Sequence, residues 1–296
     1  MIGYDMAYDI VTDSSANLTE AMYDELGITV LPLRFIHDGE ETVSYCKGKQ
    51  TDLKVFFEQM REGTVFTTSL PNSADSEKAI REILDAGRDV LYIGFSSGLS
   101  GTYESTRLIM DELAAEYPDR KLIHIDTLAA AGGEGLIVYL AAQKRIAGAS
   151  IEEVAQWVED NKFKVGHWFT VDDLMFLFRG GRVSKTSAWA GTLLNIKPVL
   201  NVDDEGHLIP RLKVRGRKKS LDALCSQMEK FATESVEDQT IFICHGDCQE
   251  DAEYLAERIQ KRLNPGKIVI NYLDPVIGAH AGPGTVALFF LASARQ

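Results

Sequence analysis

The stretch that decides the fold is DVLYIGFSSGLSGTYESTRLIMDELAAEY, residues 89–117. Its first seven residues are mostly apolar, which predicts a buried strand. A loop rich in serine and glycine follows over residues 96–102. A helix is then predicted over residues 103–117, ended by Pro118. A buried strand followed by a loop and a helix is the repeating unit of an α/β fold.

The same unit recurs on both sides of this stretch. Strands and helices are expected in alternation over residues 8–11, 20–26, 52–61, 74–86, 121–126 and 135–147. Extended segments at residues 28–36 and 41–45 flank the turn His37-Asp38-Gly39, which predicts a small hairpin. Strands that alternate with helices of ten or more residues imply a parallel sheet covered on both faces. The first half is therefore predicted to be an α/β domain with a hairpin insertion.

The second half has a different pattern. The sequence Asp203-Asp204-Glu205-Gly206 is a hairpin signature between two apolar runs. Strands are expected over residues 164–170, 197–202, 207–214, 240–245 and 267–273, with helices over 172–178, 185–194, 219–232 and 250–263. Hairpins mixed with helices predict an α+β domain with a mixed sheet. We expect two domains, residues 1–163 and 164–296.

Composition excludes several classes of protein. The 296 residues are 45% hydrophobic and 25% charged, as in ordinary globular proteins, and 31 Lys+Arg against 44 Asp+Glu give a net charge of −13. This charge argues against binding to nucleic acid or to anionic membrane surfaces. The start is acidic, without the pattern of a signal peptide, and the longest apolar runs are too short to span a bilayer. Four cysteines are too sparse for a disulfide scaffold, so we expect a soluble, reduced, cytoplasmic protein.

Three loops rich in hydroxyl and glycine residues are predicted at the carboxyl ends of strands, over residues 12–15, 67–71 and 96–102. Ligands of open α/β sheets bind at that edge. The third loop opens a helix, where free backbone N–H groups and the helix dipole favour an anion. Ordinary capping explains any one of these loops. Three on one edge favour a binding site.

A histidine framed by glycines is the second candidate. His280 lies in GAHAGPG, residues 278–284, which predicts a tight turn where backbone approaches a ligand closely. His280 could donate to an anion or be an ordinary structural histidine. In FRGGR, residues 178–182, Arg179 and Arg182 could neutralise the same anion or pair with a carboxylate between domains.

No cofactor is expected. Residues 94–102, GFSSGLSGT, lack the lysine and the spacing of a phosphate-binding loop, and the dinucleotide-binding glycine pattern is absent. Cys244, His245 and Cys248 have loose metal-like spacing, but no second pair lies nearby to complete a tetrahedral site. The sequence therefore favours no metal.

One segment runs against the acidic average. RLKVRGRKK, residues 211–219, carries six basic residues and no acidic one. Such a run is usually a solvated face. In a chain of this net charge it also suits docking to an acidic partner.

Five segments, in this order, resemble the DegV family of bacterial fatty-acid-binding proteins. They are VTDSSANL (11–18), TTSLP (67–71), SSGLSGTYEST (96–106), FRGGRVSK (178–185) and IGAHAGPG (277–284). The resemblance covers essentially the whole chain. It implies a two-domain fold with a long-chain fatty acid buried in a tunnel at the domain interface. The apolar segments 174–178 and 189–194 could supply a tunnel wall, although ordinary core is the stronger explanation for each of their residues.

The resemblance also implies roles for individual residues. The polar end of the site, which would hold the carboxylate, would be formed by Thr68, Ser69, Ser96, Ser100, Gly101, Thr102, Arg179, His280 and Gly282. Characterised relatives present the fatty acid to a separate fatty acid kinase, which makes an acyl phosphate for phospholipid synthesis. The kinase would dock on Arg211, Lys213, Arg215 and Arg217.

Two classes of function follow. The first, which we prefer, is a non-catalytic lipid carrier. The second is a stand-alone enzyme, a small-molecule kinase or a hydrolase that uses the serine and glycine loops. The missing nucleotide fingerprint counts against a kinase. A triad of Ser100 and His280 with Asp13 or Asp126 would lack the nucleophile elbow of a hydrolase.

Overall fold

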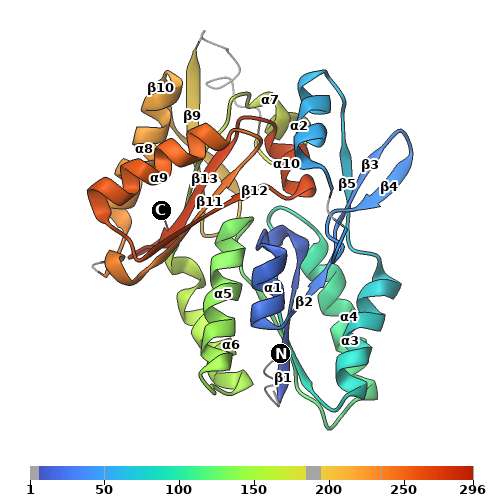
Figure 1. The fold of residues 1–296 in the computed structure, drawn as a ribbon. Coiled ribbons are helices and arrows are strands. Elements are labelled where there is room, and N and C mark those ends of the chain that lie inside the picture. The colour runs from blue at the N-terminus through green and yellow to red at the C-terminus, as the bar shows by residue number, and fades with distance from the viewer. Residues whose placement is uncertain (1–6, 50, 185–194, 234, 296) are drawn as a thin grey trace.

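A parallel sheet forms the centre of the first half (Figure 1). The computed structural model describes residues 7–49, 51–184, 195–233 and 235–295. The sheet has the order β2-β1-β6-β7 and consists of β1 (Tyr8–Asp13), β2 (Ile28–Leu31), β6 (Asp89–Gly94) and β7 (Leu122–Asp126), all parallel. Residues 90–94 of β6 are all buried, as expected of a strand covered on both faces.

Helices cover both faces of this sheet. They are α1 (Glu20–Leu26), α3 (Ser73–Asp85), α4 (Thr102–Glu116), α5 (Gly132–Ile146) and α6 (Ile151–Asn161). Helices α3 and α4 pack on one face, and α1, α5 and α6 lie on the other. The side chain of Asn72 accepts from the backbone of Asp75 and caps the start of α3. Helix α6 has no counterpart among the predicted elements, although Ser150 and Glu153 form a capping box at its start.

A small antiparallel sheet, of order β4-β3-β5, projects from the first half. The predicted hairpin is confirmed as β3 (Arg34–His37) and β4 (Glu40–Val43), and α2 (Leu53–Arg61) follows it. The third strand is β5 (Thr67–Ser69), which pairs with β3. The prediction of a loop there was wrong, because two β-branched threonines extend along the free edge of the hairpin.

A mixed sheet forms the second half, with the order β10-β9-β8-β13-β11-β12. Its strands are β8 (Val165–Thr170), β9 (Ile196–Val202), β10 (Leu208–Arg215), β11 (Thr240–His245), β12 (Lys267–Tyr272) and β13 (Val286–Leu291). The predicted hairpin is β9–β10, and β11–β12 is the parallel pair. Helices α8 (Arg217–Phe231) and α9 (Gln249–Leu263) cover one face, while α5 packs on the other. Helix α5 therefore lies between the two large sheets (Figure 1).

Two short helices lie above α5 in Figure 1. Helix α7 (Met175–Arg179) contacts α10 (Pro275–Ala281), which also contacts α2 and the small sheet. The predicted tight turn around His280 was wrong, because Asp274 caps a helix that begins with Pro275 and holds His280 in its last turn. The turn begins only at Gly282, which has φ +83°.

The fold class predicted from sequence is confirmed: a parallel sheet precedes a mixed one. The remaining short elements are the 3₁₀ helices Ser14–Ala16, Lys162–Lys164 and Val236–Asp238. The predicted helix over residues 185–194 and the wall segment 189–194 lie outside the described residues. The boundary near residues 161–166 stays a prediction. Within the described ranges, no helix is long and apolar enough to cross a bilayer.

Candidate functional site

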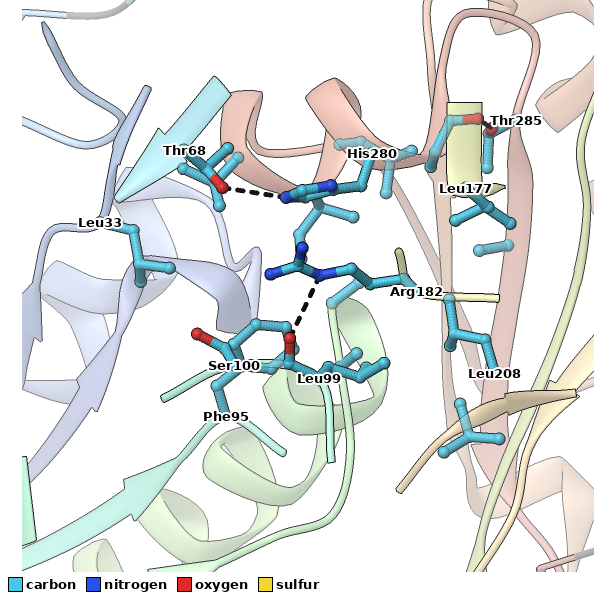
Figure 2. A pocket seen from close by; sticks show the side chains of 18 of the residues that line it. Leu33, Thr68, Phe95, Leu99, Ser100, Leu177, Arg182, Leu208, His280 and Thr285 are labelled. Carbon is cyan, nitrogen blue, oxygen red and sulfur yellow. Dashed lines mark hydrogen bonds between the residues drawn. The ribbon is translucent and has the colours of Figure 1, made fainter. Parts of the chain in front are cut away.

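A cavity of about 190 Å³ lies between the two halves (Figure 2). The first half contributes Leu33, Phe95 and Leu99 to its lining, and the second half contributes Leu177 and Leu208 among others. Most of the lining side chains are apolar. A mostly apolar cavity with a few polar groups is the usual form of a small-molecule site.

The strand register gives the cavity a direction. Alternate residues Thr285, Ala287 and Phe289, which begin just before β13 and run along it, line the cavity. On β8, Phe169 pairs with Ala287, and His167 pairs with Phe289. Four residues of strand separate Thr285 from Phe289, about 14 Å at roughly 3.4 Å per residue. The cavity therefore follows the strands away from Thr285.

Polar side chains gather around His280 (Figure 2). The hydroxyl of Thr68 is hydrogen-bonded to His280 Nε2 at 2.9 Å, and Arg182 donates from Nε to the carbonyl of Leu99 at 3.2 Å (Figure 2). Ser100 and Gly101 line the same space at the start of α4. Strand β5, the loop after β6, the segment after α7 and helix α10 thus converge on one end of the cavity.

His280 is neutral in this setting. Burial, with a smaller contribution from the nearby Arg182 charge, lowers the pKa of His280 to about 4. The backbone of Gly180 presses on the ring, so a Cβ at position 180 would stand 2.3 Å from Nδ1. Only glycine fits there. A neutral imidazole held in place on both sides is suited to pass a hydrogen bond through Thr68 to a ligand.

Of the two candidate arginines, Arg182 lines the cavity. Burial lowers its pKa. Arg179, the residue that the resemblance favoured, is exposed and stacks over Phe176 at 4.6 Å. It borders a second cavity of about 270 Å³ that shares Thr68, Arg182 and His280 with the first. The side chain turns outward because α7 is a single short helix that ends at Arg179.

The remaining predicted residues divide into two groups. Ser69 lines the cavity, although its hydroxyl donates to Glu41 Oε1 at 2.6 Å, and Ser100 lines it with its hydroxyl 2.9 Å from that of Thr102. Besides Arg179, three predicted residues are missing among the described lining residues, namely Ser96, Thr102 and Gly282.

These three residues have structural partners. Ser96 is fully buried and donates to the carbonyl of Gly206 at 3.0 Å, in the turn of the β9–β10 hairpin. Thr102 is fully buried behind Ser100. Gly282 ends α10, and its carbonyl accepts from the Thr285 hydroxyl at 2.9 Å. Their carboxylate-binding roles are not supported.

The first predicted loop, residues 12–15, lies away from the cavity in a fully buried network. Ser15 Oγ is 2.5 Å from Asp13 Oδ1 and 2.7 Å from Glu134 Oε2. Thr12 Oγ1 is 2.8 Å from the Ile93 carbonyl and 3.1 Å from Glu134 Oε1. Four contacts between oxygens share two hydroxyl protons, so a carboxyl proton must supply at least one more.

That proton belongs on Glu134. Burial raises the pKa of Asp13 as well, but Asp13 also accepts from the amides of Ser15 and Phe95 and from the Tyr92 hydroxyl, each at 3.1 Å, and these donors favour its charged form. Burial raises the pKa of Glu134 well above its usual range, and the Asp13 charge adds to this. Sequence reasoning missed Glu134, because nothing local links it to a loop 119 residues away.

The basic run also divides. Arg211, Lys213 and Arg215 are exposed on β10, an edge strand. Arg217 instead points inward, with its side chain 19% exposed, and donates to the carbonyl of Gly284 at 2.6 Å. Because this guanidinium is occupied by internal partners, its assignment to a docking surface was wrong.

The described residues contain no cluster able to hold a metal ion. Cys248 donates its thiol to the Thr285 carbonyl at 3.3 Å, and burial raises its pKa to about 12. No Ser-His-Asp triad is assembled from the described side chains, because His280 pairs with Thr68 and Asp13 is buried in its own network.

Comparison with known proteins supplies the family. The model described as "Uncharacterised protein, DegV family" matches residues 7–293. This chain belongs to the DegV family. It is 45% identical over 287 residues to a DegV domain-containing protein of Clostridium perfringens, covering 97% of this chain and 98% of that one. A DegV domain-containing protein of Streptococcus pyogenes is 38% identical over 288 residues, with coverage of 97% and 98%.

Solved DegV structures share the fold. The structure reported as fatty acid binding of a DegV family protein from Thermus thermophilus superposes with a TM-score of 0.86 at 30% identity, covering 97% of this chain and 100% of that chain. A Thermotoga maritima protein reported to reveal a fatty acid binding function has a TM-score of 0.84 at 29% identity, covering 97% and 99%. These DegV relatives bind fatty acids.

Proposed function

We propose that this chain binds a long-chain fatty acid in the cavity between its two halves, with the carboxylate at the Thr68–His280 end. The single observation that carries the proposal is the convergence of hydroxyl, imidazole and guanidinium groups at the Thr68–His280 end of a lining that is otherwise mostly apolar, with His167 as the polar side chain opposite Phe289. An amphipathic chain with one charged end has the matching distribution. The fatty-acid-binding DegV structures support this choice of ligand.

The acyl chain supplies most of the affinity in this proposal. Burying about fifteen methylene groups at about 0.8 kcal/mol each contributes on the order of 12 kcal/mol before the costs of association and ordering. The polar end fixes the orientation of the chain, because a carboxylate removed from water needs several donors.

Four groups are placed to donate to the carboxylate. The Nε2–H of neutral His280 would donate to Thr68, leaving the Thr68 hydroxyl proton for the ligand. Ser100 and the Gly101 amide approach from α4. Arg182 supplies a positive charge. Binding of an anion would therefore raise the pKa of His280 from about 4.

We further propose that the chain is a non-catalytic carrier in the cytoplasm that presents the carboxylate to a separate fatty acid kinase. A carboxylate oxygen would form a bond to the terminal phosphorus of a nucleoside triphosphate. The bond from that phosphorus to the leaving nucleoside diphosphate would break in the same step. The second cavity, with Arg179 on its border, would be the side from which the phosphoryl donor arrives. The four cysteines, all free thiols, suit a reducing compartment.

Mass spectrometry of freshly purified, denatured protein tests the ligand. We expect a co-purifying long-chain fatty acid, and its loss from His280→Ala, with binding weakened about ten- to a hundredfold, as for a hydrogen bond to a charged group. An empty protein that binds no fatty acid, or one that turns over a small substrate unaided, would sink the proposal.

Charge reversal at the edge strand tests docking. Arg215→Glu is expected to reduce phosphorylation by the partner kinase about tenfold or more at low salt, since like charges then oppose an acidic partner. The matched control is Lys267→Glu, which makes the same change on β12, the opposite edge of the sheet. Fatty acid content should be unchanged in both. Equal coupling in both variants would place docking elsewhere.

A further inference from the structure

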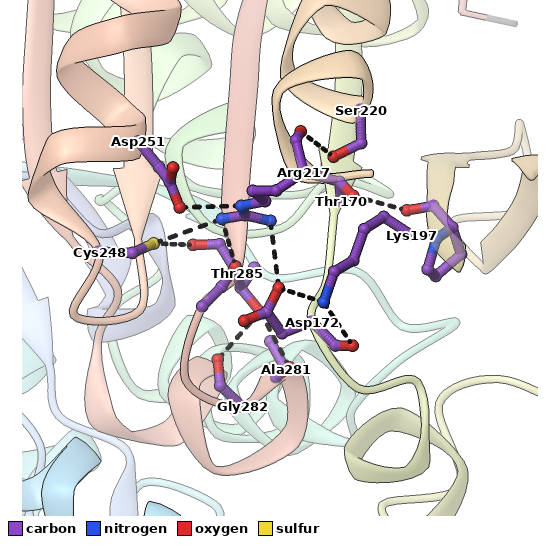
Figure 3. A network of polar contacts seen from close by, with 12 residues as sticks. Thr170, Asp172, Lys197, Arg217, Ser220, Cys248, Asp251, Ala281, Gly282 and Thr285 are labelled. Atoms are coloured by element: carbon purple, nitrogen blue, oxygen red, sulfur yellow. Dashed lines mark hydrogen bonds and ion pairs between the residues drawn. The ribbon is translucent and has the colours of Figure 1, made fainter. Parts of the chain in front are cut away.

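Arg217 differs from its neighbours in the basic run. Gly216, with φ +95°, ends the extended path of β10, and Arg217 begins α8. Its Nε donates to Asp251 Oδ2 at 2.8 Å, and Asp172 Oδ1 lies 3.7 Å from Nη1 (Figure 3). Lys197 pairs with the same Asp172 oxygen at 2.8 Å. The positive charges of Arg217 and Lys197 are thus balanced by the negative charges of Asp172 and Asp251.

The guanidinium holds one particular turn of backbone. Nη2 of Arg217 donates to the carbonyl of Gly284 at 2.6 Å (Figure 3). Asp172 closes the other side, since a Cβ at position 284 would stand 2.5 Å from its Oδ2. Gly284 has φ +77°, and its amide donates to Gly246 at 2.7 Å. Only glycine fits this turn. The carbonyl of Gly284 accepts from Arg217, and its Cα packs against Asp172.

This turn directly follows the helix that carries His280. Thr285 donates its hydroxyl to the carbonyls of Ala281 and Gly282, both at 2.9 Å, and so satisfies the free end of α10. Residues 282–285 are therefore fixed to α10 on one side and to Arg217 on the other. Any shift of Gly284 would move the helix end next to His280.

Asp172 extends the connection to the remaining cationic group of the site. It lies between β8 and α7, the helix that leads through Gly180 to Arg182. Gly180 in turn contacts the His280 ring. The same guanidinium thus anchors both segments that meet at the polar end of the cavity.

We propose that Arg217 is a positioning residue, which fixes His280 and the end of α10 from outside the cavity and joins the basic strand β10 to the polar end of the site. Its polar partners among the described residues are Asp172, Asp251, Cys248 and Gly284, which lie outside the cavity lining. The inference rests on the proposed function only in treating the polar end as the place of the ligand carboxylate.

The test compares Arg217→Met with Lys219→Met, which removes the same charge from an exposed position of the same run. His280 is titrated by NMR in ligand-free protein, where its pKa is about 4. We expect Arg217→Met to move this pKa toward 6.5 as the packing around the ring loosens, and to weaken binding of a fluorescent fatty acid about tenfold. Lys219→Met should change neither.

Arg217→Lys keeps the charge, and with it the fold, but a single ammonium cannot reproduce the fork that reaches Asp251 and Gly284 together. It should give an intermediate shift of the His280 pKa. A wild-type titration and wild-type affinity in folded Arg217→Met, or in Arg217→Lys if the first variant does not fold, would overturn the proposal. A wild-type protein that binds no fatty acid would instead count against the proposed function, while the ligand-free titration still decides the role of Arg217.

Discussion

Two hydroxyl-rich loops follow neighbouring strands of the parallel sheet and end up with opposite roles. The first, residues 12–15, consists of the last two residues of β1 and the start of the 3₁₀ helix that follows, and it is buried and binds its own chain. The loop after β6 places Ser100 and Gly101 on the cavity. Both strands end at the same edge, and both loops contain serines and an N-terminal helix start. Position at the sheet edge therefore does not by itself decide which loop meets a ligand.

Buried carboxyl groups account for the difference. Asp13, Glu134 and the carbonyl of Ile93 accept or share every hydroxyl proton that Thr12 and Ser15 can offer. Asp13 also accepts from the Phe95 amide, directly before the second loop. The polar groups of the first loop are thus all engaged in hydrogen bonds within the protein, and one of these bonds holds the start of the second loop. Within the described part of the chain, the hydroxyl of Ser100 has Thr102 as its side-chain partner, and Ser100 lines the cavity.

The largest expected effect comes from removing Asp13. Asp13→Ala would leave the amides of Ser15 and Phe95 and the Tyr92 hydroxyl without an acceptor in a fully buried site. Each such group costs about 1–3 kcal/mol, so we expect a loss of at least ~3 kcal/mol in the free energy of unfolding. Urea denaturation followed by circular dichroism measures it. A loss below about 1 kcal/mol would show that the network does not stabilise the fold.

The next pair of variants removes one hydroxyl group from each loop. Ser100→Ala should weaken fatty acid binding about tenfold while changing the free energy of unfolding by about 1 kcal/mol or less. Ser15→Ala should do the reverse, lowering stability by about 1–3 kcal/mol with near-normal affinity. Displacement of a fluorescent fatty acid and urea denaturation, run on both variants, give the two readouts. If Ser15→Ala weakens binding as strongly as Ser100→Ala at equal stability, the division between the loops fails.

Much of the fold could be predicted because its signals are local. Helix α1 (Glu20–Leu26) and strand β11 (Thr240–His245) have the predicted bounds, since caps and apolar runs lie within the segments themselves. Helix α10 was misread because three glycines suggested a turn, whereas Asp274 and Pro275 start a helix that tolerates Gly278. Strand β5 was misread because its partner, β3, lies about thirty residues earlier in the chain.

The site was predicted in part. Of the residues predicted to bind a carboxylate, Thr68, Ser69, Ser100, Gly101 and His280 line the cavity, and their role there stays a prediction. The choice between two arginines three residues apart depends on where a single-turn helix ends and which way the chain then runs, and sequence spacing carries neither. The inward turn of Arg217 depends on Gly284, 67 residues later. Contacts between distant segments thus decide which members of a motif meet the ligand.

The smallest expected effect is the pH dependence of the free energy of unfolding that Glu134 causes. Glu134 holds its proton in the fold, because burial and the Asp13 charge raise its pKa well above 4.5, while the unfolded chain ionises near that value. The folded state then binds more protons than the unfolded state, so stability falls as the pH rises from about 4.5 toward the folded pKa, by up to about 1.4 kcal/mol per pH unit. Glu134→Gln has the donor and acceptor of a protonated acid and cannot ionise, so it should remove this slope.

Asp274, whose pKa burial raises to about 7, contributes a slope of the same sign to both proteins and cancels in their difference. Parallel stability curves for the two proteins would mean that Glu134 is ionised, and that the loop after β1 holds two charged carboxylates beside the hydroxyls of Thr12 and Ser15.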